Sequence, residues 1–139
     1  MVNEVQVVQY RPEHLVKLKL KMASMEEKPP SVNTYAVTFM RGSEPIAIFG
    51  SFCPTLGVSH IWGLVSEEVY KIPKTFFQTV KNYLTHIERT EQFRRIQIDV
   101  REDFVEGNKF AQALGFKLEA RLNHYNPDGS NAMLYARTY

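Results

Sequence analysis

The sequence predicts a single domain, residues 1–139, of the α/β (α+β) class, with a mixed, mostly antiparallel, twisted sheet of six to seven strands flanked by helices. The first observation behind this prediction is the stretch Arg94–Lys117, where alternating apolar and polar residues give way to helical spacing. The second is a broad apolar helical face over residues 72–87. The third is the length of 139 residues, which is enough to bury one core.

The composition is that of a packed globular protein. Hydrophobic residues make up 44% of the chain, aromatic residues 12%, and the formal net charge is +2. So small a charge demands neither nucleic acid nor a membrane surface as a partner. No apolar run reaches the ~18 residues of a membrane span, and the single cysteine, Cys53, excludes an internal disulfide. We therefore expect a cytoplasmic protein in which Cys53 is an ordinary small apolar residue.

The N-terminal region is predicted to contain a strand, a helix and a loop. Residues 2–10 are rich in strand-forming side chains. Pro12 then starts a helix, because proline suits the first helical turn. The adjacent Pro29 and Pro30 mark the loop that ends it. The buried stripe of this helix is predicted from spacing to consist of Leu15, Leu18, Met22 and Met25.

A β-hairpin and a third strand are predicted next. Apolar alternation over residues 35–40 and 46–52 indicates two strands, with a turn over residues 41–45. Residues 53–57 are predicted to form a loop, because they contain a proline and a glycine. Ser59–Val65 is predicted as the third strand, and Gly63 within it indicates a bulge or a close backbone approach.

The second half is predicted to form helix, strand, helix and hairpin, which gives the order β-α-β-β-β-α-β-α-β-β. Because a long helix lies between them, the strands Ser59–Val65 and Arg95–Val100 should run parallel and splay apart at their carboxyl ends, opening a cleft. Gly115 should cap the second of these helices. Residues 118–125 and 132–139 form the closing hairpin.

This organisation resembles the GNAT superfamily, the acetyl-CoA-dependent N-acyltransferases, over nearly all 139 residues. The resemblance is carried by Tyr10-Arg11-Pro12 at the first strand-to-helix junction, by the strand HIWGLVSEE leading into a long helix, and by the helix end FAQALGF. Size, the plain hairpin EPIAIFGSF and a degraded cofactor loop also resemble small GNAT-like proteins of tailed phages, including internal virion proteins.

The resemblance implies acetyl-CoA as cofactor, with its pyrophosphate at a helix N-terminus. The family cradles this group with Arg/Gln-x-x-Gly-x-Gly/Ala, and the equivalent segment here is residues 70–75. Pro73, near the first glycine, has no N–H, so the loop departs from the family pattern. The implied cofactor-binding residues are Val65, Ser66, Lys71, Ile72, Lys74, Thr75 and Asn108. The alternative interpretation is that the lysines are solvated at a helix start and that Asn108 is a surface residue.

Acyl transfer also requires a base for the attacking amine. Glu67 and Asp99 are the predicted catalytic residues, and Glu68 and His60 are further candidates for the same role. The two glutamates also suit a solvated turn, Asp99 an outward strand position and His60 a strand edge. In the family a tyrosine protonates the leaving thiolate, and Ala111 stands at that position here.

The acceptor side is predicted to involve three residues, although aromatic strand residues usually just pack. These substrate-binding candidates are His60, Tyr125 and Tyr135. The four histidines of the chain lack metal-ligand spacing, so no metal site is expected. No basic stripe interleaved with aromatics favours nucleic acid.

Two functions follow from the resemblance. The first is an N-acyltransferase that moves an acetyl group from acetyl-CoA to an amine of a small molecule or protein. The second is a catalytically silent GNAT-fold structural or interaction protein, such as a phage virion component or host-factor binder, in the host cytoplasm or the virion. A homo-oligomer or contact with virion proteins is compatible with either function, because the fold alone does not choose between them.

Overall fold

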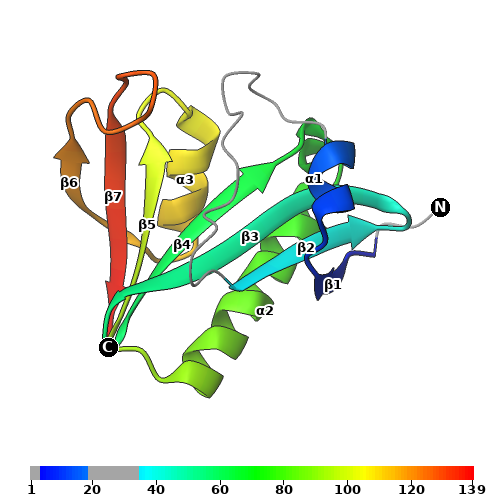
Figure 1. The fold of residues 1–139 in the computed structure, drawn as a ribbon, viewed down its shortest axis with the longest axis horizontal. Coiled ribbons are helices and arrows are strands. Elements are labelled where there is room, and N and C mark those ends of the chain that lie inside the picture. The colour runs from blue at the N-terminus through cyan, green and yellow to red at the C-terminus, as the bar shows by residue number, and fades with distance from the viewer. Residues whose placement is uncertain (1–3, 19–34) are drawn as a thin grey trace. The chain divides into compact units, whose positions relative to one another are not determined.

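The computed structural model of the protein describes residues 4–18 and 35–139. Its elements follow the predicted order, with one added 3₁₀ helix (Figure 1). They are β1 (Gln6–Gln9), α1 (Pro12–Lys17), β2 (Tyr35–Arg41), β3 (Glu44–Thr55), β4 (Val58–Val65), η1 (Glu67–Lys71), α2 (Pro73–Glu91), β5 (Arg95–Arg101), α3 (Val105–Ala113), β6 (Lys117–Leu122) and β7 (Ala132–Thr138).

The strands form a seven-stranded sheet in the order β1-β2-β3-β4-β5-β7-β6, which confirms the predicted mixed and mostly antiparallel class. β4 and β5 are the parallel pair, in register from Val58 opposite Arg95 to Ile61 opposite Ile98. This parallel pairing is the one predicted from the long helix between the two strands. The predicted splay of their carboxyl ends and the resulting cleft stay predictions.

The chain divides into two compact units, which are described separately below. Unit 1 comprises Met1–Phe52 and Trp62–Glu91. Unit 2 comprises Cys53–Ile61 and Gln92–Tyr139. The prediction of one domain over residues 1–139 stays a prediction.

The core of unit 1 is an aromatic cluster between α2 and the strands β2 and β3, which lie along it in Figure 1. Phe39 is fully buried, and its ring centroid lies 5.0 Å from that of Phe49, 6.1 Å from that of Phe76 and 5.9 Å from that of Tyr83. Edge-on and tilted rings at these distances add attraction beyond the burial of apolar area. A Cβ atom at Gly63 would lie 2.6 Å from the Phe49 ring, which confirms the predicted close approach.

A smaller cluster in unit 1 joins α1 to the sheet. Leu18, Ile48 and Leu64 are buried together, and Leu15 packs against them. Leu15 lies in α1 as predicted, but the predicted continuation of this helix through Leu18 is wrong: α1 ends at Lys17, and Leu18 has extended backbone with a φ of −69° and a ψ of 125°. Met22 and Met25, the other two members of the predicted stripe, lie outside the described residues.

Unit 2 combines β5, β6 and β7 with α3, which lies beside β5 in Figure 1. Ile96 of β5, Ala111 of α3 and Phe116 are buried. Gly115 has a φ of 91° and directly follows the last helical turn, as predicted for a glycine C-cap. The backbone amide of Phe116 bonds back to the Ala111 carbonyl at 3.1 Å, which completes the cap.

The predicted loop over residues 53–57 is wrong. β3 continues to Thr55, so Cys53 lies exposed within a strand, and only residues 56–57 form the turn to β4. Gly57 takes the left-handed conformation this turn needs, with a φ of 82°. The Arg94 guanidinium donates to the Leu56 carbonyl at 2.6 Å, and the Arg94 amide donates to the Gly57 carbonyl at 3.0 Å. These bonds come from a residue 37 or more positions away, which local turn propensity does not anticipate.

Candidate active site

The end of β4 and the start of α2, both in unit 1, form the segment predicted to bind the cofactor. Val65 ends β4, and Ser66 is 1% exposed. The Ser66 backbone amide donates to the Ile46 carbonyl at 2.9 Å, and its Oγ accepts from the Glu68 amide at 3.1 Å, capping η1. The polar groups of Ser66 thus hold η1 onto the end of the strand.

The first turn of α2 leaves two backbone amides pointing out of the helix end. Pro73 has no N–H, and the amide of Phe76 already bonds to the Ile72 carbonyl at 2.9 Å. Lys74 and Thr75 lie between them, at positions where an α-helix offers no internal acceptor. Among the residues of α2, the first turn holds no acidic side chain to compete for these donors. Two amides at a positive dipole end suit one phosphate group.

The two lysines of this segment differ in availability. The Lys71 ammonium lies 3.0 Å from a carboxylate oxygen of Glu68 within η1. Lys74 is exposed at the start of α2. Ile72 is buried, and its amide donates to the Val69 carbonyl at 3.2 Å, so its backbone is committed to η1. The segment therefore fits a phosphate through Lys74, its amide and that of Thr75, a smaller donor set than a glycine-rich loop offers.

Unit 2 brings together His60 and Asp99, which the sequence predicted as separate candidates. The His60 Nε2 and Asp99 Oδ1 atoms lie 2.6 Å apart. The His60 side chain is 9% exposed and that of Asp99 is 24% exposed. His60 is thus a buried residue of β4 rather than the strand-edge residue of the alternative interpretation. The Gln97 amide nitrogen lies 2.9 Å from His60 Nδ1, so both ring nitrogens have partners.

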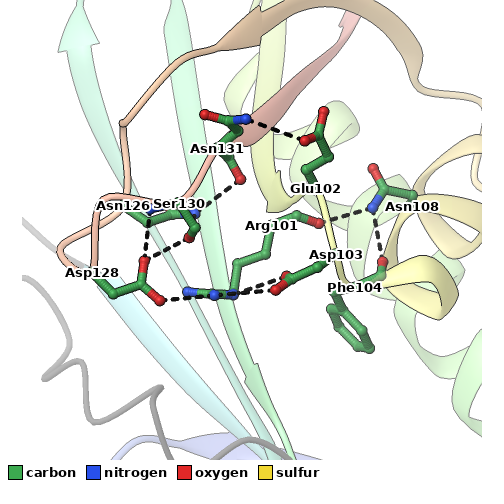
Figure 2. Close-up of polar contacts among 9 residues, drawn as sticks. All are labelled: Arg101, Glu102, Asp103, Phe104, Asn108, Asn126, Asp128, Ser130 and Asn131. Carbon is green, nitrogen blue, oxygen red and sulfur yellow. Dashed lines mark hydrogen bonds and ion pairs between the residues drawn. The ribbon is translucent and has the colours of Figure 1, made fainter.

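Asn108 and Tyr135, predicted for cofactor and substrate, bond to each other. The hydroxyl of Tyr135, which is 2% exposed, donates to Asn108 Oδ1 at 2.7 Å. The Asn108 amide donates to the carbonyls of Arg101 and Phe104, at 2.9 and 2.8 Å, as Figure 2 shows. These bonds tie α3 to the end of β5 and to β7. These bonds give the polar atoms of both side chains partners within unit 2, without a ligand.

The remaining candidates lie at the surface. Glu67 is exposed in the first turn of η1, and Tyr125, between β6 and β7, is 54% exposed. Ala111, which the resemblance places at the position of a thiolate acid, is 3% exposed and is buried in α3. The roles predicted for the individual residues stay predictions.

A second polar cluster of unit 2 was missed from the sequence. Arg101 lies between two carboxylates, 2.9 Å from Asp128 and 3.2 Å from Asp103, as Figure 2 shows. Asp128 also accepts from the Ser130 amide and hydroxyl, at 3.0 and 2.6 Å. The hydrogen bonds from Ser130, then that from Arg101, lower the pKa of Asp128. Asp128 lies between the two strands of the predicted closing hairpin, but nothing local in the sequence indicates its pairing with Arg101.

The described residues contain neither a metal-ligand cluster nor a helix suited to span a membrane. Across residues 4–18 and 35–139, no group of three or more His, Cys, Asp or Glu side chains has the arrangement that holds a metal ion. In the same residues, no helix combines the length and the apolar character that crossing a membrane requires.

Comparison with solved structures identifies the fold. The chain superimposes on the ribosomal-protein-S5-alanine acetyltransferase from Vibrio fischeri with a TM-score of 0.75 at 13% identity, covering 97% of this chain and 93% of that one. It matches a chimera of the spermidine N-acetyltransferase SpeG from Vibrio cholerae and hSSAT with a TM-score of 0.74 at 9% identity, covering 97% and 94%.

A third match is RimL, a ribosomal L7/L12 alpha-N-protein acetyltransferase solved in complex with coenzyme A, with a TM-score of 0.64 at 21% identity. The match covers 76% of this chain and 62% of that one. The chain therefore has the fold of the GNAT acetyltransferases, as the sequence predicted. The sequence matches no family model and no curated protein.

Proposed function

We propose that this protein binds acetyl-CoA at the start of α2 and transfers the acetyl group to an amine. The observation that carries the proposal is the N-terminal turn of α2, with two unpaired backbone amides, an exposed lysine at residue 74 and no competing acid. The GNAT fold, shared with proteins solved with coenzyme A, supports it.

Each residue of the segment has a defined task in this proposal. The amides of Lys74 and Thr75 donate to a phosphate oxygen, and the Lys74 ammonium neutralises its charge. Ser66 holds η1 in place through its cap. Bound acetyl-CoA supplies a thioester whose carbonyl carbon an amine attacks, releasing the thiolate. Glu67 and Asp99 remain the proposed acceptors of the proton that the amine loses.

Isothermal titration with acetyl-CoA tests the proposal. We expect micromolar binding, weakened at least tenfold by Lys74→Glu, which reverses the charge beside the phosphate. Lys81→Glu, on an exposed position of the same helix, makes the same change in net charge away from the helix end and should leave binding nearly unchanged.

The complementary experiment tests whether a variant of this turn binds acetyl-CoA more tightly than the native chain. The double change Pro73→Gly with Thr75→Gly returns one N–H donor and removes a β-branched side chain. A recovered charge-assisted hydrogen bond contributes roughly 1.5–3 kcal/mol, about ten- to a hundredfold in affinity. A folded double-glycine variant that binds acetyl-CoA no better than the native chain would contradict the assignment of the phosphate to this turn.

The alternative is a GNAT-fold protein without catalysis that acts by binding a partner, such as a host factor or virion protein. Two observations favour it: Ala111 is buried where the family places its thiolate acid, and the polar atoms of Asn108 are bonded within unit 2. Absence of acetyl-CoA binding at millimolar concentration would favour this alternative over the enzyme.

A further inference from the structure

Five polar side chains of unit 2 form a continuous hydrogen-bonded network. Asp99 bonds to His60 at 2.6 Å, and His60 bonds to Gln97 at 2.9 Å. The Arg95 Nε atom donates to Gln97 Oε1 at 2.7 Å, and the same guanidinium forms two bonds to Glu119, at 2.6 and 3.0 Å. Arg95, Gln97 and Asp99 alternate along β5, so their side chains share one face of that strand.

The order of the bonds in this network fixes the orientation of the Gln97 amide. A guanidinium only donates hydrogen bonds, so the atom of Gln97 that faces Arg95 is the oxygen. The amide nitrogen then faces His60 Nδ1 and donates to it. Turning the amide over would set its N–H₂ against the Arg95 N–H, leaving two donors in contact.

The protonation of His60 follows from that orientation. Because Nδ1 accepts a hydrogen bond from Gln97, it carries no proton, and the ring proton lies on Nε2, where it is donated to Asp99. A second proton on Nδ1 would face the Gln97 N–H₂ group. The ring is therefore held as the neutral Nε2–H tautomer.

If His60 is neutral, one negative charge of this five-residue network has no positive partner within the network. The charges of Arg95 and Glu119 cancel, and the Arg95 bonds lower the pKa of Glu119, keeping that carboxylate ionised. The remaining charge is on Asp99, which is more exposed than His60. Only its Oδ1 atom is bonded within residues 4–18 and 35–139, and Oδ2 keeps its capacity to accept.

We propose that Asp99 is the receiving group for the ammonium of a cationic amine, and that His60, Gln97 and Arg95 act through it as positioning residues. This inference rests on the proposed function and narrows its acceptor to an amine that arrives as a cation. His60 does not contact the amine, because its Nε2 atom is bonded to Asp99 and its Nδ1 atom to Gln97. A carboxylate with one oxygen fixed by a buried ring presents the other in a defined direction.

Nuclear magnetic resonance of the ¹⁵N-labelled histidine rings tests the positioning step without any ligand. We expect His60, assigned by its loss in His60→Gln, to carry its proton on Nε2 at neutral pH. Gln97→Glu replaces the donor facing Nδ1 by an acceptor, and we expect it to add a proton there. Gln112→Glu, at an exposed position of α3, adds the same charge and should leave the His60 signals unchanged. A native His60 protonated on Nδ1 would overturn the positioning step.

Titration with spermidine at 150 mM salt tests the binding step. We expect Asp99→Asn to lower the affinity at least tenfold, because it removes the negative charge that pairs with the ammonium. Glu91→Gln, which removes an exposed charge from the end of α2, should change it less than twofold. Native affinity in a folded Asp99→Asn variant, or no spermidine binding by the native chain, would overturn the inference.

The two proposals fail separately. Loss of acetyl-CoA binding with an intact Asp99-dependent spermidine response would reject only the cofactor proposal. Acetyl-CoA binding with a spermidine response that ignores Asp99 would reject only the assignment of Asp99.

Discussion

The two units of this protein are stabilised by different means. Unit 1 has an aromatic core, in which Phe39 contacts three other rings. Unit 2 has networks of ion pairs and hydrogen bonds between charged and polar side chains, centred on Arg95 and Arg101. Their titratable groups differ accordingly, since burial above all raises the pKa of Tyr83 in unit 1 to about 12, whereas hydrogen bonds lower the pKa of Asp128 in unit 2.

This difference predicts unequal responses to substitution. Removing a buried ring forfeits its transfer free energy and leaves a cavity, which partial relaxation does not fill. Removing a partly exposed ion pair lowers the free energy of unfolding by less, because water replaces the missing partner. Removing a buried hydrogen bond between neutral groups should lower the free energy of unfolding by an intermediate amount.

The largest effect is expected in unit 1. Phe39→Ala should lower the free energy of unfolding by about 3–5 kcal/mol, because the ring is fully buried among aromatic neighbours. Urea unfolding followed by circular dichroism measures it. Val16→Ala, at a position 86% exposed on α1, serves as the control and should change stability by less than ~0.5 kcal/mol. A Phe39→Ala variant as stable as this control would contradict the aromatic core.

A smaller effect is expected at the neutral hydrogen bonds of unit 2. Asn108→Ala should cost roughly 1–3 kcal/mol, because it leaves the buried Tyr135 hydroxyl without its partner and removes one of the two donors to each of two backbone carbonyls. Tyr135→Phe removes only the hydroxyl and should cost about 1 kcal/mol. The double variant measures their coupling, and strict additivity of the two losses would show that the two side chains do not share a bond.

The smallest effect is expected at the exposed carboxylate of Asp128, and it should depend on pH. The pKa of Asp128 in the folded protein is lowered from 3.8, so the folded state favours its ionised form. The stability that this carboxylate contributes is complete above the unfolded pKa and is lost as pH falls toward the folded value. The difference in melting temperature between native protein and Asp128→Asn should therefore be constant at neutral pH and shrink below about pH 4. A difference that grows on acidification would contradict the Arg101 and Ser130 contacts.

The sequence was informative wherever a pattern repeats within one element. The apolar face of α2 follows from helical spacing, and its residues Phe76, Val80, Leu84 and Ile87 are indeed buried. Gly115 and Gly63 were recognised because each has a local backbone or packing requirement that other residues do not meet. The loop over residues 53–57 was predicted wrongly, because the bonds from Arg94 that define the shorter turn are not local.

The candidate site was predicted only in part for the same reason. His60 and Asp99 were each recognised as polar residues capable of acid–base chemistry, but nothing in the sequence paired them across 39 positions. Gln97 and Arg95 were not singled out, since a glutamine or arginine on a strand is ordinary at the surface. The contact of Gln97 with His60 depends on the parallel register that sets these two residues opposite each other.

The sequence by itself determined the fold class and the element order, and it predicts the departure of residues 70–75 from the glycine-rich phosphate loop. These features depend on periodicity, on caps and on the missing N–H of Pro73, all of which are local properties. The tertiary structure decided which polar side chains meet, among them His60 with Asp99 and Gln97 with both His60 and Arg95. The physical reason is that hydrogen bonds are short and directional, so their partners are fixed by strand register and not by distance along the chain.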